Sequence, residues 1–282
     1  MKIKSARIGI VSVCYNSNSV LPNMLASIPK DVPVVLVNNR YDSENNVLVE
    51  MAKSHNATLI SNKTNKGFGT ACNQGAEILN KEFLLFLNPD AVLDPDALDA
   101  LLKAADTFPS AVAFNPRIIL PSGTPFFKRR SHLLPRSKKM ARGWPKNDCE
   151  VSILSGAAMF VRRTIFMKAG GFDPAIFLFY EDDDLALRLH NQYGKLFFIR
   201  DSLVMHMSGK SSGPSIETVV LKAWHMGRSR VYATRKHGRP MPYTHAMISA
   251  LSKMFLISTL FSKRNRAKQF AYLRGVISAW RL

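Results

Sequence analysis

Acidic residues are missing from a long stretch of this 282-residue chain: segment 218–282 contains no Asp or Glu. The same segment carries thirteen Lys and Arg residues, and a second acid-free block between Lys128 and Lys146 carries eight more. The formal net charge of +19 therefore resides in these two segments, and the rest of the chain is nearly neutral. Such local basicity predicts an anionic partner: a membrane surface, a nucleic acid or a phosphorylated substrate.

Cysteine is scarce, with only Cys14, Cys72 and Cys149 in the whole chain. Three widely spaced cysteines argue against a disulfide framework and against a zinc site, and they fit a reducing compartment. The apolar segment near the N-terminus is short and lacks a small-residue cleavage site, so we expect a first strand rather than a signal peptide. These features predict a cytoplasmic protein.

Long hydrophobic runs are also absent. The longest mostly apolar stretch, 246–261, spans sixteen residues and is interrupted by Lys253, whereas a membrane-spanning helix needs about 20 apolar residues. Flanking basic residues favour a helix lying in the interface at the inner face of the cell membrane. The alternative is an ordinary C-terminal helix packed against the protein.

Short apolar runs alternate with helical segments in the first half of the chain. This alternation predicts βαβ units, and therefore an α/β fold with a mostly parallel central sheet. We expect strands at 8–13, 32–37, 57–60 and 83–87, with helices at 20–28, 44–54 and up to 79. Further short strands are expected at 111–114, 117–120, 157–161, 195–199 and 202–205, with a helix from about 163. We predict a catalytic domain at 1–217, with a mobile basic loop at 124–148, and a basic helical tail at 218–282.

Four adjacent carboxylates, Glu181-Asp182-Asp183-Asp184, follow the apolar run 176–180. That context predicts that at least one carboxylate lies in a partly desolvated cleft, where its pKa rises and it serves as a base. Arg188 has the i,i+4 spacing to pair with Asp184. The alternative is an acidic first turn that is stabilised by the helix N-terminus.

Polar residues follow several of the predicted strands, where ligands of open α/β sheets bind. Asn88 and Asp90 close one strand, and their oxygens suit Mg²⁺ or Mn²⁺, although Asn-Pro-Asp is also a good turn. His206 closes the last strand and is interpreted as either a ligand or a structural residue. The glycines around Gly67 match neither a Walker loop nor the dinucleotide fingerprint.

The order of these motifs along the chain is similar to that of a known enzyme family. It comprises Tyr15-Asn16, Asn38-Asn39, Asn65-Lys66-Gly67-Phe68-Gly69, Asn73-Gln74-Gly75, Asn88-Pro89-Asp90, Gly156-Ala157, Gly170-Gly171-Phe172-Asp173, Glu181-Asp182-Asp183-Asp184-Leu185 with Arg188, and His206 with Gly209. Over residues 6–240 the chain resembles the family 2 glycosyltransferases of the GT-A fold, in particular their bacterial rhamnosyltransferase-like branch.

The resemblance implies inverting transfer of a sugar from a nucleoside diphosphate. The first expectation for the donor is dTDP-L-rhamnose, and the expected acceptor is a polyprenyl-diphosphate-linked or oligosaccharide hydroxyl. The implied roles are catalytic base for Asp182; acceptor contact or support for Glu181, Asp184, Arg188 and Gly156; nucleotide-sugar binding for Tyr15, Asn38, Asn65, Gly67, Asn88 and Asp90; and metal binding for Asn88, Asp90 and His206. Asp183 is expected to face outward.

Two positions depart from the family pattern. Asn38 stands where the family usually has Asp, although an amide oxygen still accepts from a pyrimidine N3–H. The metal motif has fewer carboxylates than is usual, so the cation is expected to arrive with the donor. The alternatives are a UDP-sugar donor with a non-lipid acceptor, a catalytically dead scaffold, a sugar nucleotidyltransferase and a nucleic-acid-binding protein. The last two are disfavoured, because segment 12–22 lacks Gly, Lys and Arg and the basic blocks lack stacking aromatics.

Overall fold

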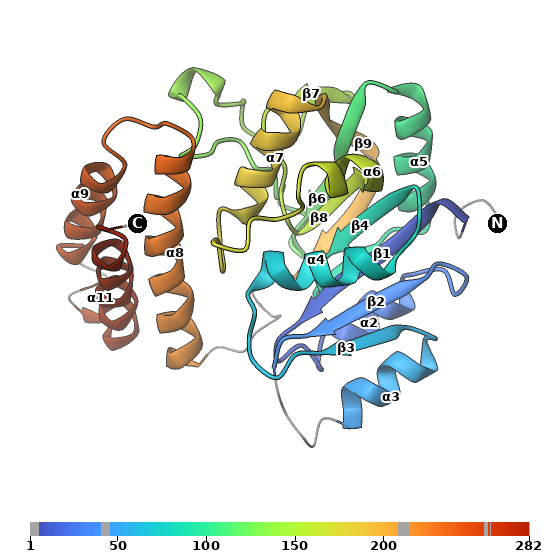
Figure 1. The fold of residues 1–282 in the computed structure, drawn as a ribbon, viewed down its shortest axis with the longest axis horizontal. Coiled ribbons are helices and arrows are strands. Elements are labelled where there is room, and N and C mark those ends of the chain that lie inside the picture. The colour runs from blue at the N-terminus through green and yellow to red at the C-terminus, as the bar shows by residue number, and fades with distance from the viewer. Residues whose placement is uncertain (1–5, 41–45, 208–214, 257–258, 260, 282) are drawn as a thin grey trace.

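A computed structural model describes residues 6–40, 46–207, 215–256, 259 and 261–281 (Figure 1). Among these residues, nine strands form one sheet with the order β3-β2-β1-β4-β8-β6-β9-β5, and β7 pairs with β9. The strands are β1 (Ile8–Cys14), β2 (Val34–Asn38), β3 (Thr58–Ser61), β4 (Phe83–Leu87), β5 (Ala91–Leu93), β6 (Ala111–Ile119), β7 (Cys149–Val151), β8 (Ala158–Arg162) and β9 (Lys195–His206). Strands β1 to β4, β6 and β9 run in one direction, so the sheet is mostly parallel, as predicted.

Helices cover both faces of the sheet. One face packs against α2 (Leu21–Ala26), α3 (Asn46–Ser54) and α5 (Ala97–Thr107), and the other against α4 (Phe68–Ile78), α6 (Arg163–Lys168) and α7 (Glu181–Gln192). The residues of β1 alternate between the two cores, with Ile8 and Ile10 in one and Val11 and Val13 in the other. A strand buried on both faces reads as a continuous apolar run, which explains why β1 was visible in the sequence.

The second half of the sheet is more continuous than the sequence suggested. The predicted strands 111–114 and 117–120 form the single strand β6, and 195–199 and 202–205 form the single strand β9. The register between β6 and β9 shifts between Pro116 and Arg117, because Pro lacks the N–H that a regular ladder requires. The sequence analysis also missed β5, β7 and α5.

The C-terminal segment folds into helices that stand beside the sheet domain (Figure 1). These are α8 (Ile216–Lys236), α9 (Pro242–Met254) and α11 (Lys263–Ser278). They share a separate core rich in alanine. A Cβ on Gly227 would lie 2.3 Å from the Tyr272 carbonyl oxygen, and one on Gly275 would lie 2.0 Å from that of Trp224. Both glycines are therefore needed for the close approach of α8 and α11.

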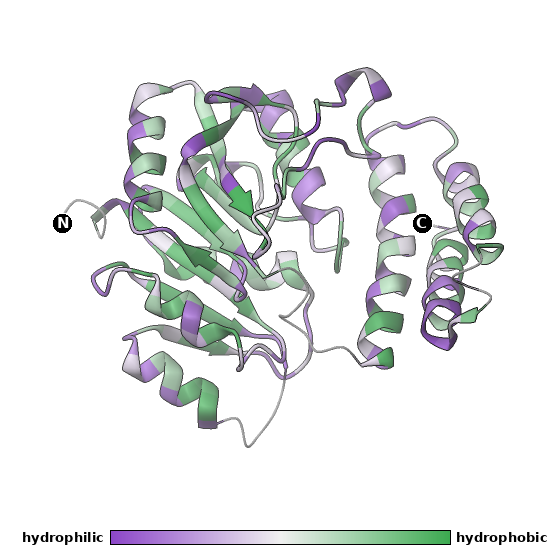
Figure 2. Ribbon diagram, turned by 180° about the vertical axis from the view of Figure 1, so that it is seen from behind, coloured by the Kyte–Doolittle hydropathy of each residue, from purple (hydrophilic) through white to green (hydrophobic). Residues whose placement is uncertain are grey.

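Apolar and polar residues alternate along these helices, whereas the strands of the sheet are mostly apolar (Figure 2). Ala246 and Ala250 of α9 are buried, and Ile248 and Leu251 of the same helix are exposed. Some side chains of the mostly apolar segment 246–261 are thus packed against the protein, and others face outward. Residues 257, 258 and 260 of this segment lie outside the described residues. No described helix is long and apolar enough to cross a membrane.

Candidate active site

The acidic cluster forms the first turn of α7, and a strained turn leads into it. Phe179 and Tyr180 have φ angles of 66° and 71°, a left-handed conformation that is uncommon for aromatic residues. Strain of this kind gathers at functional sites. This turn was not predictable, because neither residue is glycine. The turn carries the cluster directly into the helix, and Glu181 is the first helical residue.

Asp182 is the only acidic residue of the cluster that is not fully buried, with 17% of its side chain exposed. Its Oδ2 accepts a hydrogen bond from the Lys128 ammonium at 2.6 Å and one from the Gly156 backbone N–H at 2.9 Å. A Cβ on Gly156 would lie 3.2 Å from the Asp182 Cβ. Gly156 therefore leaves room for the carboxylate that its own N–H orients, and the structure brings these two predicted site residues together.

The neighbouring carboxylates lie deeper. Burial, reinforced by the charge of Asp182, raises the pKa of Glu181 to about 8. Burial also raises the pKa of Asp183 to about 6, although Lys128 opposes the shift. The prediction that Asp183 faces outward is wrong: its side chain is 7% exposed and lies 3.0 Å from the Lys128 ammonium. The sequence could not reveal this, because Lys128 comes from a loop fifty-odd residues away.

Asp184 is fully buried and belongs to a separate ionic network. Its Oδ2 pairs with Arg188 at 2.9 Å, which confirms the expected i,i+4 contact. Its Oδ1 lies 2.7 Å from Lys236 and 2.8 Å from His237, both at the end of α8. Burial alone would raise the pKa of Asp184, but hydrogen bonds from His237 and Lys236 lower it to about 2. Asp184 thus joins the C-terminal helices to α7.

The three residues predicted to hold a metal lie together beyond β4 and at the end of β9. The Nε2 of His206 is 3.3 Å from Asn88 Nδ2 and 3.3 Å from Asp90 Oδ1. Both carboxylate oxygens of Asp90 are buried and accept no hydrogen bond. A buried carboxylate without hydrogen bonds is costly, and a divalent cation would satisfy it. The described residues contain no group of three His, Cys, Asp or Glu side chains around one point, so further ligands would have to come from the donor.

The residues predicted to bind the nucleotide follow β1, β2 and β3. Tyr15 directly follows β1 and is half-buried, and Asn38 ends β2 and is buried. The Asn38 side-chain oxygen accepts from the Arg40 N–H at 3.0 Å. Asn39, which the sequence analysis did not assign, donates to the Gly67 carbonyl at 2.8 Å and thereby connects the end of β2 to the start of α4.

Gly67 is required by the geometry of this region. Its φ is 82°, and a Cβ would lie 2.4 Å from the Phe177 carbonyl oxygen. Its N–H donates to the side chain of Asn65 at 3.0 Å, and the next N–H, of Phe68, donates to that same Phe177 carbonyl at 3.0 Å. The predicted nucleotide loop is therefore fastened to the segment that precedes the acidic cluster.

A short backbone segment links the metal group to Asp182. The Asn88 N–H donates to the Ala157 carbonyl at 2.9 Å, and the preceding residue, Gly156, donates to Asp182. The dipeptide Gly156-Ala157 thus lies between Asn88, which is predicted to bind the donor diphosphate, and Asp182, the predicted base. This arrangement can hold a leaving group on one side and a nucleophile on the other.

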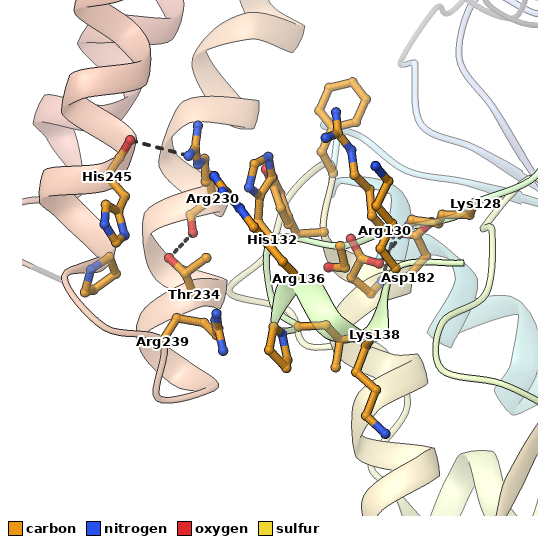
Figure 3. Close-up of a pocket in the computed structure, with 18 of the residues that line it drawn as sticks. Lys128, Arg130, His132, Arg136, Lys138, Asp182, Arg230, Thr234, Arg239 and His245 are labelled. Carbon is orange, nitrogen blue, oxygen red and sulfur yellow. Dashed lines mark hydrogen bonds and ion pairs between the residues drawn. The ribbon is translucent and has the colours of Figure 1, made fainter. Parts of the chain in front are cut away.

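A pocket of about 990 Å³ opens beside Asp182 (Figure 3). It lies between the first turn of α7, the loop that carries Lys128, and the ends of α8 and α9. The lining includes the carboxylates Glu181, Asp182 and Asp183 together with seven Lys and Arg side chains: Lys128, Arg130, Arg136, Lys138, Lys139, Arg230 and Arg239. None of the predicted nucleotide- or metal-binding residues lines it. The pocket therefore adjoins Asp182 and does not include the residues predicted to bind the donor.

The fold is that of a GT-A enzyme, a class of nucleotide-sugar-dependent glycosyltransferases. Residues 9–170 match the domain described as Glycosyl transferase family 2, and the chain belongs to that family. It is a glycosyltransferase, as the motifs predicted.

Among its relatives is the N-acetylglucosaminyl-diphospho-decaprenol L-rhamnosyltransferase of Mycobacterium tuberculosis, 26% identical over 94% of this chain and 97% of the relative. A poly-beta-1,6-N-acetyl-D-glucosamine synthase of Staphylococcus epidermidis is 25% identical over 39% of this chain and 29% of its own length.

Solved structures share the fold at low identity. S. aureus TarS, residues 1–349, matches with a TM-score of 0.57 at 16% identity over 98% of this chain and 91% of its own. The mannosyltransferase PcManGT from Pyrobaculum calidifontis, in complex with GDP-Man and Mn²⁺, matches with a TM-score of 0.59 at 16% identity over 97% and 87%. These similarities confirm the predicted GT-A architecture.

Proposed function

We propose that this protein is an inverting glycosyltransferase that moves a sugar from a nucleoside diphosphate to a hydroxyl of a polyprenyl-diphosphate-linked acceptor. The observation that carries the proposal is the shared turn of chain: Gly156 orients Asp182, and its neighbour Ala157 holds Asn88. The mycobacterial relative is named for a diphospho-decaprenol acceptor and rhamnosyl transfer, which supports the lipid-linked acceptor and makes dTDP-L-rhamnose the first donor to test.

Asp182 is the base in this proposal. An acceptor hydroxyl that enters from the 990 Å³ pocket meets Asp182 before it reaches the donor residues. The carboxylate takes the hydroxyl proton as the oxygen attacks the anomeric carbon, and general bases of this kind contribute about 10²–10⁴ in rate. A single displacement inverts the anomeric configuration. The N–H of Gly156 keeps Oδ2 in place throughout, because it is a rigid backbone donor.

Asn88, Asp90 and His206 fit a divalent cation, because the buried oxygens of Asp90 accept no hydrogen bond. When bound there, Mg²⁺ or Mn²⁺ supplies positive charge for the negative charge that develops on the leaving diphosphate. The protein's part is to hold oxygen and nitrogen ligands at the ends of β4 and β9. The PcManGT structure, which contains GDP-Man and Mn²⁺, supports this assignment at the level of the fold.

The C-terminal helices are proposed to hold the enzyme at the inner face of the cell membrane. Large apolar side chains are exposed on or next to α9 and α11, among them Ile248, Leu251, Phe255, Leu256, Phe261, Phe270, Ile277 and Trp280. Basic residues of the acid-free segment 218–282 are interspersed with them along the sequence. Helices that expose both apolar and cationic side chains favour an anionic lipid interface. In this proposal the domain at 1–217 performs catalysis and the tail at 218–282 supplies the membrane contact.

The proposal is tested with a panel of nucleotide sugars, each with and without Mn²⁺ or Mg²⁺. Slow hydrolysis of the correct donor is expected in the absence of acceptor, and faster turnover is expected when a polyprenyl-diphosphate sugar is added. If a UDP-sugar were the sole substrate, it would replace dTDP-L-rhamnose as the assigned donor. Equal activity on a lipid-free acceptor would show that the acceptor does not need the lipid. Turnover of no nucleotide sugar under any condition would contradict the proposed function.

A further inference from the structure

Apart from Lys128, the cations that line the pocket beside Asp182 have no anion of their own. The acidic residues nearby are already engaged: Asp182 and Asp183 with Lys128, and Asp184 with Arg188 and Lys236. Among the described residues no ion pair is found for Arg130, Arg136, Lys138, Lys139, Arg230 or Arg239. The pocket lining therefore carries a large excess of positive charge.

Arg230 shows that this charge is built into the pocket. Its side chain is 92% buried, since only 8% is exposed, and it is held by the Tyr272 hydroxyl at 2.9 Å and the His245 carbonyl at 3.4 Å. These neutral partners fix the guanidinium but do not neutralise it. Buried charges are normally paired, so the position predicts an anion that comes from outside the protein.

His132, on the opposite wall of the pocket, is subject to the positive potential of the same cations. Partial desolvation, and then the charges of Arg230 and Arg130, lower the pKa of this imidazole to about 4. His132 is therefore neutral near pH 7 and adds a hydrogen-bonding group to the cationic lining (Figure 3).

We infer that this pocket binds the diphosphate of the acceptor, with Arg136 and Lys138 on one side and Arg230 and Arg239 on the other. The inference rests on the proposed function, which places an acceptor hydroxyl at Asp182. In a sugar linked to a lipid diphosphate, the phosphates lie about one sugar ring away from the reacting hydroxyl. Figure 3 places Asp182 at one end of the pocket and Arg230 and Arg239 at the other, with Arg136 between them. Arginine guanidinium groups form bidentate hydrogen bonds with phosphate oxygens.

The pocket walls also suggest the direction of the lipid. Leu134 and Pro135 accompany the loop cations, and Pro240 and Pro242 accompany Arg239 at the start of α9. From there α9 continues to the exposed Ile248 and Leu251. The first isoprene units are thus expected to leave between the basic loop and α9.

The test is direct binding of farnesyl diphosphate to the whole protein in EDTA, measured by calorimetry without donor. EDTA separates this site from the donor diphosphate site, which is proposed to need a divalent cation. Arg136 and Lys138 are exposed, so the double variant Arg136→Ala/Lys138→Ala is expected to fold, unlike a change at buried Arg230. Loss of two charged hydrogen-bonding partners predicts that the Kd rises about tenfold or more.

Lys103→Ala/Lys168→Ala is the matched control, because it removes two exposed charges outside the pocket; its Kd should equal that of the wild type. Inorganic pyrophosphate should compete with farnesyl diphosphate, and dTDP and UDP should not. Equal binding by the pocket variant, or displacement by either nucleotide, would overturn the inference. So would an equal loss of binding to phosphatidylglycerol vesicles in the pocket variant, because the residues would then serve the membrane surface. Donor turnover by the wild type tests the proposed function separately, so either idea can fail alone.

Discussion

The ammonium of Lys128 lies 2.6 Å from Oδ2 of Asp182 and 3.0 Å from Oδ1 of Asp183. One side chain from the basic loop thereby bridges two of the three α7 carboxylates that line the pocket. The acceptor hydroxyl must share Asp182 with this ammonium or replace it. Lys128 thus couples the loop, which is proposed to bind acceptor diphosphate, to the base that activates the hydroxyl.

Lys128→Met is expected to make stability more sensitive to pH. Without the ammonium, the folded-state pKa of Asp183 rises further above its unfolded value. The stability that Asp183 contributes to the folded state is then fully present below its unfolded pKa. It is lost as the pH rises through the higher folded pKa. The loss at pH 8 should be about 2 kcal/mol, or a fall of about 5 °C in Tm, and it should be small at pH 5. Thermal unfolding between pH 5 and 8 measures it, with Lys103→Met as the control; a uniform loss at all pH values would count against the pairing.

Glu181→Gln should shift the pH dependence in the opposite direction. The pKa of Glu181 is raised to about 8 in the folded protein, mainly by burial, and is near 4.3 when unfolded. The wild type therefore loses stability as pH rises from about 4 through 8, and the neutral amide does not. The Tm of the variant relative to the wild type should climb over this range and level off above pH 8. Glu50→Gln, on the exposed surface of α3, should give a flat difference, and a flat difference for Glu181→Gln as well would refute the assignment.

Asp184→Asn is expected to destabilise the protein by about 3 kcal/mol at pH 7, because Arg188, Lys236 and His237 lose their shared buried partner. The folded pKa of about 2 lies below the unfolded value. The stability that the Asp184 carboxylate contributes is thus present above its unfolded pKa and disappears as the pH falls through 2. Urea unfolding from pH 7 to pH 3 should show a constant difference down to about pH 4 and a smaller one below. The exposed Asp201→Asn serves as the control, and a cost under about 0.5 kcal/mol at pH 7 would mean that the network is not structural.

Asp90→Asn should weaken cation binding, since it removes the one carboxylate of the group formed with Asn88 and His206. The expected result is a rise of about tenfold or more in the Kd for Mn²⁺ in the presence of nucleoside diphosphate, measured by paramagnetic resonance. Asp94→Asn, at an exposed site just before α5, should leave the Kd unchanged. Unchanged Mn²⁺ affinity in Asp90→Asn would place the cation elsewhere.

Much of the fold was predictable because β1, β2 and β4 are buried on both faces and appear as uninterrupted apolar runs. The strand ends then located Asn38, Asn88 and Asp90. Elements such as β5 and β7 could not be predicted, because three residues carry too little periodicity and depend on pairing with β9.

Within the site, the pairing of Asp184 with Arg188 was predictable because helical spacing alone determines it. The burial of Asp183 was not, because Lys128 reaches it from a distant loop. The contacts of Asp184 with Lys236 and His237 were hidden for the same reason: they depend on how α8 packs against the catalytic domain. Long-range ionic contacts leave no local pattern in a sequence.

The most direct test of the central claim is the turnover of Asp182→Asn, compared with the wild type, on the donor and polyprenyl-diphosphate acceptor that the substrate panel identifies. The amide preserves the size of the side chain and removes its basicity. The account predicts that kcat falls about 10²-fold or more, while the Kd for the nucleotide sugar, measured by calorimetry, stays within about twofold. Undiminished turnover in Asp182→Asn would contradict the assignment of Asp182 as the base.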